Sequence, residues 1–229
     1  MVVVGINDEV YVYGDNGGQM PPKVLLKFNS RTKAFEETSI SFPQDVDRLG
    51  VDGDGNFWGF TDETVYKLNS KGTLTKTYSV ASGFARGLSI GADGTVYIVA
   101  GSTLYQLKSG TNTFTKFSND DARLVAVGRA GDLWIVDSNY YVQQYTGSKF
   151  ENRPLGQSVE ANAIAASTDG TVYISHWAGS DYQLQKWNAT NKSFDTVNNV
   201  EADKVAVDSA GRPWIAYTSM NTDVKRGKD

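Results

Sequence analysis

Residues 88–99 read LSIGADGTVYIV, and this stretch decides the fold of the chain. A short apolar run leads into Ala-Asp-Gly, and a run of Val, Tyr and Ile follows the glycine. Asp-Gly between two such runs is typical of a β-hairpin, because tight hairpin turns need the positive φ angles that these residues tolerate. We therefore expect two antiparallel strands, joined by a two-residue connection at Asp93 and Gly94.

The turn and second strand of this hairpin recur through the whole chain. Each copy has an aromatic residue at its centre, and the copies lie about 40 residues apart. The six copies are NDEVYVY (7–13), DGNFWGF (54–60), DGTVYIV (93–99), AGDLWIV (130–136), DGTVYIS (169–175) and AGRPWIA (210–216). Self-similarity at this period, with several short strands in each repeat, is typical of blades in a β-propeller.

The rest of each repeat supplies two further strands. After residues 88–99 the chain continues with TLYQLK (103–108) and TFTKFS (113–118), which are rich in strand-forming residues. The sequence thus predicts an all-β fold, a six-bladed β-propeller of four-stranded antiparallel blades that forms one domain over residues 1–229. The blades are expected at approximately residues 1–43, 44–82, 83–119, 120–157, 158–199 and 200–229.

Two repeats depart from this pattern. The first carries an insert, GDNGGQMPPK (14–23), and the last has room after Trp214 for a third strand at about 223–227 but hardly for a fourth. The N-terminal run VVVGI (2–6) is already needed as the first strand of the first blade. We expect a three-stranded last blade, or an open edge that pairs with another subunit in a homo-oligomer.

Composition and charge argue against a nucleic-acid or membrane partner. Lys and Arg number 22 against 26 Asp and Glu, so the net charge is −4, and no cluster of basic residues indicates a nucleic-acid partner. The sequence has no apolar run long enough to insert into a membrane. Because it also lacks cysteine and a signal-like start, we expect a cytoplasmic protein.

The residues give little support to catalysis. His176 is the only histidine and cysteine is absent, which argues against a metal cluster or a Cys-His pair. The sequence has no Gly-x-Ser-x-Gly elbow, phosphate-binding loop or dinucleotide fingerprint. We expect a protein that is not an enzyme and has no cofactor, with His176 in a loop.

Polar residues gather where the topology joins loops on one face. In each blade, the start of the first strand and the connection from the second to the third strand lie on the same face of the propeller, which we call the loop face. The Asp-Gly turns lie on the opposite face, which we call the hairpin face. The first strands begin with Arg48, Arg86, Arg123, Asn162 and Lys204. The neighbouring connections carry Asp15, Asn16, Asp62, Glu63, Ser102, Asp137, Asn139, His176, Trp177 and Asn221. Variable loops on a rigid scaffold commonly carry function.

These residue types suit a sugar ligand. Sugar hydroxyls need hydrogen-bond donors and acceptors in fixed directions, and the C–H face of a sugar packs on an aromatic ring such as Trp177. A methoxy group would need a small apolar notch between two blades. The aromatic residues of the second strands could line it, and these are Trp58, Tyr97, Trp134, Tyr173 and Trp214. The predicted ligand-binding residues are these five aromatic residues together with Arg48, Arg86, Arg123, Asn162, Lys204, Asp62, Asp137, Asn139 and Trp177. We expect no metal site.

The segments VAVGRAGDLWIV (125–136) and LSIGADGTVYIV (88–99) resemble the tectonin β-propellers, tachylectin-like lectins of fungi and slime moulds. The resemblance extends to all six repeats. It implies a six-bladed propeller, often oligomeric, that binds cell-surface glycans at several equivalent sites. It also implies a role in innate defence, with O-methylated sugars of bacteria or nematodes as one class of ligand.

Two other functions remain open. The chain could be a protein-interaction scaffold that uses a flat propeller face, or a hydrolase or lyase similar to gluconolactonase-like propellers, which share the Asp-Gly-x-Val/Leu-Trp core. The lectin hypothesis predicts several similar small pockets in register. The scaffold predicts a broad exposed apolar patch, and the enzyme predicts one acid-lined pocket at the central channel.

Overall fold

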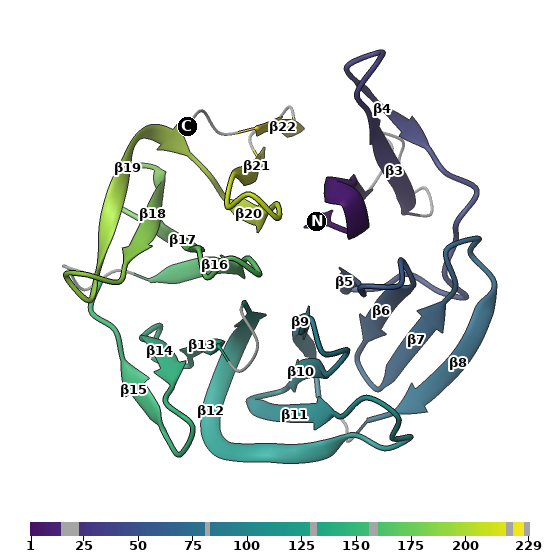
Figure 1. Cartoon of the computed structure of the whole chain (residues 1–229), viewed down its shortest axis with the longest axis horizontal. Helices are drawn as coiled ribbons and strands as arrows, with labels where there is room; N and C mark the ends of the chain where they lie inside the picture. Colours follow the sequence, from purple (N-terminus) through teal and green to yellow (C-terminus); the bar gives the residue numbers. More distant parts are fainter. Residues whose placement is uncertain (15–22, 81–82, 129–131, 156–159, 219–221, 227–229) are drawn as a thin grey trace.

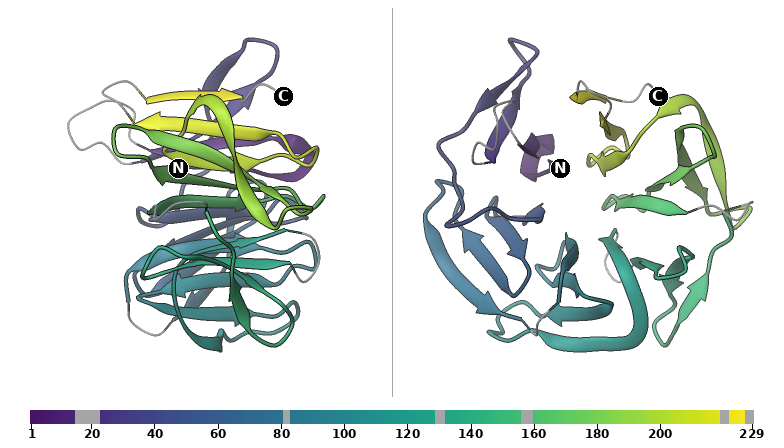
Figure 2. Two further views of the ribbon diagram at one scale, coloured as in Figure 1. Left: turned by 90° about the vertical axis from the view of Figure 1, so that its left-hand side faces the viewer. Right: turned by 180° about the vertical axis from the view of Figure 1, so that it is seen from behind.

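The computed structural model of the chain describes residues 1–14, 23–80, 83–128, 132–155, 160–218 and 222–226. Their regular elements are β-strands and one short 3₁₀ turn, η1 (Ile6–Asp8), which confirms the all-β prediction. The sheets stand around a common axis, with the first strand of each nearest the centre (Figure 1). Figure 2 shows the same arrangement from the side and from behind. The insert at 15–22 and the loop residues Asp15, Asn16 and Asn221 lie outside the described residues.

Neighbouring strands are antiparallel throughout the described sheets, and chain order is followed in each. The first sheet contains β1 (Val2–Val4), β2 (Val10–Gly14), β3 (Val24–Asn29) and β4 (Ala34–Glu37). The second contains β5 (Arg48–Val51), β6 (Phe57–Thr61), β7 (Thr64–Leu68) and β8 (Leu74–Ser79). The third contains β9 (Ala85–Ile90), β10 (Val96–Ala100), β11 (Thr103–Leu107), β12 (Thr115–Val127), β13 (Leu133–Asp137), β14 (Val142–Tyr145) and β15 (Phe150–Asn152).

The last two sheets complete the arrangement. One contains β16 (Ala161–Ala166), β17 (Val172–Trp177), β18 (Tyr182–Asn188) and β19 (Ser193–Glu201). The other contains β20 (Lys204–Val207), β21 (Pro213–Thr218) and β22 (Thr222–Arg226). The last sheet therefore has three strands within the described residues, and its third strand lies where the sequence predicts one.

The seven-stranded sheet arises from one long strand, β12. Its first residues pair with β11, as Thr115 does with Gln106, and its last residues pair with β13, as Val127 does with Leu133. The ladder is irregular in both pairings. β12 runs along the outside and then turns toward the centre (Figure 1), so it is the fourth strand of one repeat and the first strand of the next.

The hairpins between first and second strands are longer than the predicted two-residue connection. The N–H of Asp52 donates to the carbonyl oxygen of Asn56, and the N–H of Gly55 donates to that of Asp52, each at 3.0 Å. Gly55 has a φ of 77°, whereas Asp54 does not have a positive φ. A three-residue loop that ends on a left-handed glycine also fits the twist of paired strands. Asp54 therefore needs no positive φ.

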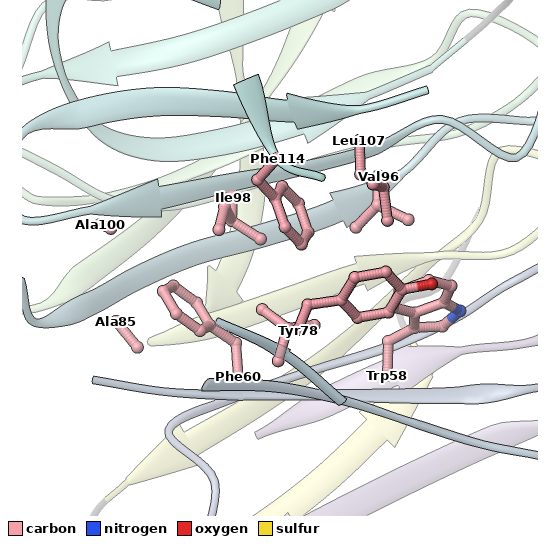
Figure 3. Close-up of a cluster of buried hydrophobic side chains, with 10 residues drawn as sticks. Trp58, Phe60, Tyr78, Ala85, Val96, Ile98, Ala100, Leu107 and Phe114 are labelled. Carbon is pink, nitrogen blue, oxygen red and sulfur yellow. The ribbon is translucent and has the colours of Figure 1, made fainter. Parts of the chain in front are cut away.

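Aromatic and aliphatic side chains fill the space between adjacent sheets. Between the second and third sheets, Trp58, Phe60 and Tyr78 face Ile98 and Phe114 (Figure 3). The Trp58 and Tyr78 rings stack with centroids 5.7 Å apart and an interplanar angle of 19°. Burial of apolar area stabilises a fold by about 25 cal/mol per Å², so contacts between neighbouring sheets are the main stabilising interaction.

The first and last sheets also pack against each other. Val2 and Val10 form one buried cluster with Ala206 and Ala216, and Phe28 contacts Trp214 with ring centroids 5.3 Å apart. β1 and β20 are neighbours in this packing without being hydrogen-bonded as one sheet. The two ends of the described chain are therefore held together by side chains.

Candidate functional site

A cavity of about 430 Å³ lies on the central axis. It is lined by the innermost strand of every repeat, from β1, β5, β9, the end of β12, β16 and β20. The innermost strands approach closely: a Cβ built on Gly50 of β5 would collide with Leu88 of β9 and lie 3.1 Å from Ile90. The cavity walls are thus set by tight contact between neighbouring repeats.

The five polar residues predicted at the strand starts come together at the loop-face end of this cavity. They are Arg48, Arg86, Arg123, Asn162 and Lys204, and all of them line it. Each is the first or second residue of its innermost strand, except Arg123, which lies within β12 where that strand turns to pair with β13. Strand order predicted that these residues share one face, and the structure adds that they meet at the mouth of the axial cavity.

Two of the five share one carboxylate. Lys204 Nζ lies 2.8 Å from Asp203 Oδ1, and Asn162 Nδ2 donates to the same oxygen at 2.5 Å. Asp203 is buried, and the contacts with Lys204 and Asn162 hold its Oδ1 in place. The positive charge of Lys204 is balanced by its neighbour in the chain.

The three arginines lie in a different environment. Arg48 donates from Nε to the carbonyl oxygen of Arg86 at 2.5 Å and from Nη1 to that of Asp47 at 2.6 Å. The Arg123 guanidinium lies 4.2 Å from the centre of the Tyr140 ring, and Arg86 is exposed. Among the described residues, none of the three forms an ion pair with a carboxylate within 4.0 Å.

Burial is the main cause of a lowered pKa at Arg48, because it disfavours the charged guanidinium. The charge of Asp47 opposes this change, whereas the charges of Arg86 and Arg123 lower the pKa further. Arg86 and Arg123 are therefore close enough for their charges to act on Arg48 at the cavity mouth.

The predicted loop residues differ in their availability. Asp62 and Asn139 are exposed. Asp137 is buried, and its Oδ1 accepts the backbone N–H groups of Asn139 and Tyr141 at 2.8 and 2.9 Å. Burial raises the pKa of Asp137 despite these bonds. Trp177 is 44% exposed and meets Tyr182 edge-on, with centroids 5.1 Å apart.

The predicted aromatic notch residues lie inside the packing between sheets. Trp58, Trp134 and Tyr173 are buried, and Tyr97 and Trp214 are partly buried. Trp58 pairs with Gly50 across the ladder, whereas Arg48 pairs with Phe60. The rings are thus nearer the hairpin face than the arginines, and the structure does not bring the two sets into one site.

Two exposed aromatic residues on the loop face were not predicted. Phe84, directly before β9, is 73% exposed, and Tyr141, directly before β14, is 54% exposed. Their positions in loops beside predicted site residues were the available signal. A second cavity, of about 390 Å³, lies between the ends of β18 and β19 near the hairpin face.

His176 was expected in a loop, and this prediction is wrong. The residue lies in β17 and is buried, because Val172 and Ile174 on the same side of the strand belong to the core facing the preceding repeat. Neither ring nitrogen makes a hydrogen bond of ordinary geometry to a described residue. Burial lowers the pKa of His176.

No protein-family model matches the sequence, and no curated protein matches it significantly. Solved structures do match. The structure of U3-55K and the crystal structure of RRP9 WD40 repeats each share 11% identity with this chain at a TM-score of 0.65, covering 93% of it and 72% and 71% of their own chains. YCF48 bound to D1 peptide shares 15% identity at a TM-score of 0.62, covering 93% of this chain and 73% of that one. The fold is a β-propeller.

At these identities the likeness shows the propeller fold alone. The prediction of a propeller is confirmed, and membership of the tectonin family is not shown. The described part of the chain contains no helix long and apolar enough to cross a membrane. Within the same residues, no group of three or more His, Asp or Glu could hold a metal ion.

Proposed function

We propose that this propeller is a non-catalytic carbohydrate-binding protein with its site at the loop-face mouth of the axial cavity. One observation carries the proposal: Arg48, Arg86, Arg123, Asn162 and Lys204, from five different repeats, converge on one cavity of about 430 Å³. Cavities of roughly 300–1,000 Å³ with a few convergent polar groups are typical of small-ligand sites.

The chemistry at the mouth suits a polyhydroxylated ligand. The guanidinium groups offer several N–H donors, and the Asp203 carboxylate holds Lys204 and Asn162 in place at the same mouth. Phe84 and Trp177 on the same face offer rings for the C–H face of a sugar. A donor set and exposed rings thus lie on one face of the propeller.

We also propose six blades, one for each sequence repeat, with β12 belonging to two of them. A site on the axis occurs once in each propeller, unlike the several equivalent sites that the tectonin resemblance implies. Binding of a multivalent surface with high avidity would then require association of subunits, since avidity comes from linked sites.

A glycan-array screen of the labelled protein tests the proposal. The array carries O-methylated mannose and fucose, their unmethylated forms, and neutral and acidic saccharides. Binding that the free sugar abolishes, and that Arg86→Gln weakens, supports the proposed site. Arg31→Gln is the matched control, because Arg31 is also an exposed arginine but lies between β3 and β4 at the hairpin face. Equal loss in both variants, or no binding at all, would contradict the proposal.

A protein-interaction scaffold is the second candidate, and the exposed rings favour it. Phe84, Tyr141 and Trp177 all lie on the loop face, and apolar side chains exposed on one face can form a docking surface. Two results together would favour the scaffold. The protein binds no sugar on the array, and it captures a partner protein that a Phe84→Ala, Trp177→Ala double variant does not capture. Leu74→Ala is the control, because Leu74 is similarly exposed, at 46%, but begins β8 at the hairpin face.

A further inference from the structure

We infer that the sugar bound at the cavity mouth carries an oxyanion, a carboxylate or a sulfate ester, which the three arginines hold. The inference rests on the proposed function and names the ligand class of that site. It starts from Arg48, Arg86 and Arg123, which lie on adjacent innermost strands at one end of one cavity.

Within the described part of the chain, the three arginines at this mouth are not paired with a carboxylate at contact distance. Among the described residues, Arg48, Arg86 and Arg123 lack a carboxylate within 4.0 Å. Lys204, at the matching position across the mouth, is paired with Asp203. Like charges held together repel, and a bound anion relieves this repulsion. The anion site is therefore on the arginine side of the mouth, away from Lys204.

The arginines are also held ready for a ligand. Two backbone carbonyls fix Arg48 through Nε and Nη1, and within the described residues its Nη2 makes no hydrogen bond; the Tyr140 ring supports Arg123. A guanidinium offers two parallel N–H donors that match the oxygens of a carboxylate or sulfate. Donors that are already oriented lose less conformational freedom on binding, so they bind more tightly.

The positive charge is local, since the chain as a whole has a net charge of −4. General attraction of anions to the protein is thus disfavoured, and recognition must come from contact at the mouth. Phe84, two residues before Arg86 and 73% exposed, can pack against the sugar ring while the arginines hold its anion. These features together select a ring that carries a charge over a neutral ring.

Titration calorimetry with matched monosaccharides tests the inference. The probes are glucuronate and galacturonate, glucose and galactose, and glucose 6-sulfate, at low and at physiological salt. We expect each acidic sugar to bind at least about tenfold more tightly than its neutral counterpart, since hydrogen bonds to charged groups are worth more than neutral ones. We also expect salt to weaken the acidic ligands selectively.

Variants assign the preference to the arginines. Arg86→Gln and Arg123→Gln should each weaken the binding of acidic sugars about tenfold more than the binding of their neutral counterparts. Arg31→Gln should leave both unchanged, and circular dichroism checks that each variant is folded. Equal binding of acidic and neutral sugars would overturn the inference and leave the proposed function intact. An acidic preference that persists in both variants would overturn the assignment to the arginines. Absence of binding to every sugar would overturn the proposed function itself.

Discussion

Asp8 accepts two hydrogen bonds from Ser209, from its backbone N–H at 2.7 Å and from its Oγ at 2.9 Å. These bonds join the first hairpin of the chain to the last one, on the hairpin face of the propeller. They are the polar complement of the apolar seam between the first and last sheets, where Val2 and Val10 meet Ala206 and Ala216. These contacts join segments of the first and last sheets that are 201 residues apart in the chain.

Asp8→Asn should lower the free energy of unfolding by about 1 kcal/mol, because a charge-assisted pair becomes a neutral one in an exposed position. Asparagine is chosen because Asp8 has a φ of 59°, which Asn tolerates better than Ala. Urea denaturation at pH 7 measures the change. Asp54→Asn, in the matching turn of the second sheet, serves as the control and should change stability less. Equal losses would show that the seam bonds contribute nothing of their own.

Gly50→Ala should destabilise the protein by about 1–3 kcal/mol, because the new methyl group would collide with Leu88 on the neighbouring innermost strand. Gly53→Ala is the matched control, since a Cβ at Gly53 has nothing within 4 Å. Thermal and urea unfolding of the two variants measure the difference. A Gly50→Ala variant as stable as Gly53→Ala would mean that the innermost strands can move apart without cost.

Trp58→Phe should destabilise the fold more than Trp134→Phe, by about 1–2 kcal/mol, although Trp134 is the more deeply buried ring. Trp58 Nε1 donates to the buried carboxylate of Asp52 at 2.9 Å, whereas Trp134 Nε1 has no partner among the described residues. Removing the first donor breaks a bond, and removing the second relieves an unsatisfied group. Chemical denaturation of both variants decides, and the reverse order would contradict the hydrogen-bond argument.

The stability of the protein should fall below about pH 6.5 because of His176. Burial lowers the pKa of His176 from its ordinary value of 6.5, so on acidification the unfolded chain takes up a proton before the native protein does. Stability that is present above the unfolded pKa is therefore lost as pH falls toward the folded pKa. Asp137, whose pKa burial raises, acts in the opposite direction at lower pH.

Urea denaturation of the wild-type protein and of a His176→Leu variant between pH 7.5 and 5.5 tests this pH dependence. The range extends about one unit either side of the ordinary pKa of histidine. The variant should lose less stability on acidification than the wild type does. Parallel decline of the two proteins would assign the pH dependence to other groups.

The repeats could be predicted because local chemistry determines them. Runs of apolar and aromatic residues on either side of a turn predict where the strands lie. A glycine in the turn predicts where the chain reverses, as Gly55 does with its φ of 77°. The shared face of Arg48 and Arg86 followed from topology, since antiparallel order decides which loops meet. Such inferences need only the order of the strands.

What the sequence could not provide depends on contacts between repeats. The rings of Trp58 and Trp134 were assigned to ligand notches, but other rings cover them. Tyr78 of the same sheet stacks on Trp58, and Trp187 of the next sheet packs on Trp134. The pairing of Lys204 with Asp203, and its absence at the arginines, depends on side-chain distances that no periodicity reports. His176 is buried because its side of the strand faces the preceding repeat, which a single-repeat pattern does not reveal.

The unbroken run of β12 gives the propeller an asymmetry that its sequence repeats conceal. Arrays of repeats ordinarily unfold, lengthen or shorten at the joints between units, because each unit contacts only its neighbours. Here the joint between the third and fourth repeats is a single strand, Thr115–Val127, hydrogen-bonded on one side to β11 and on the other to β13. Opening one of these two blades strips hydrogen bonds from the strand that also begins the other. We therefore expect the two blades to open as one cooperative unit.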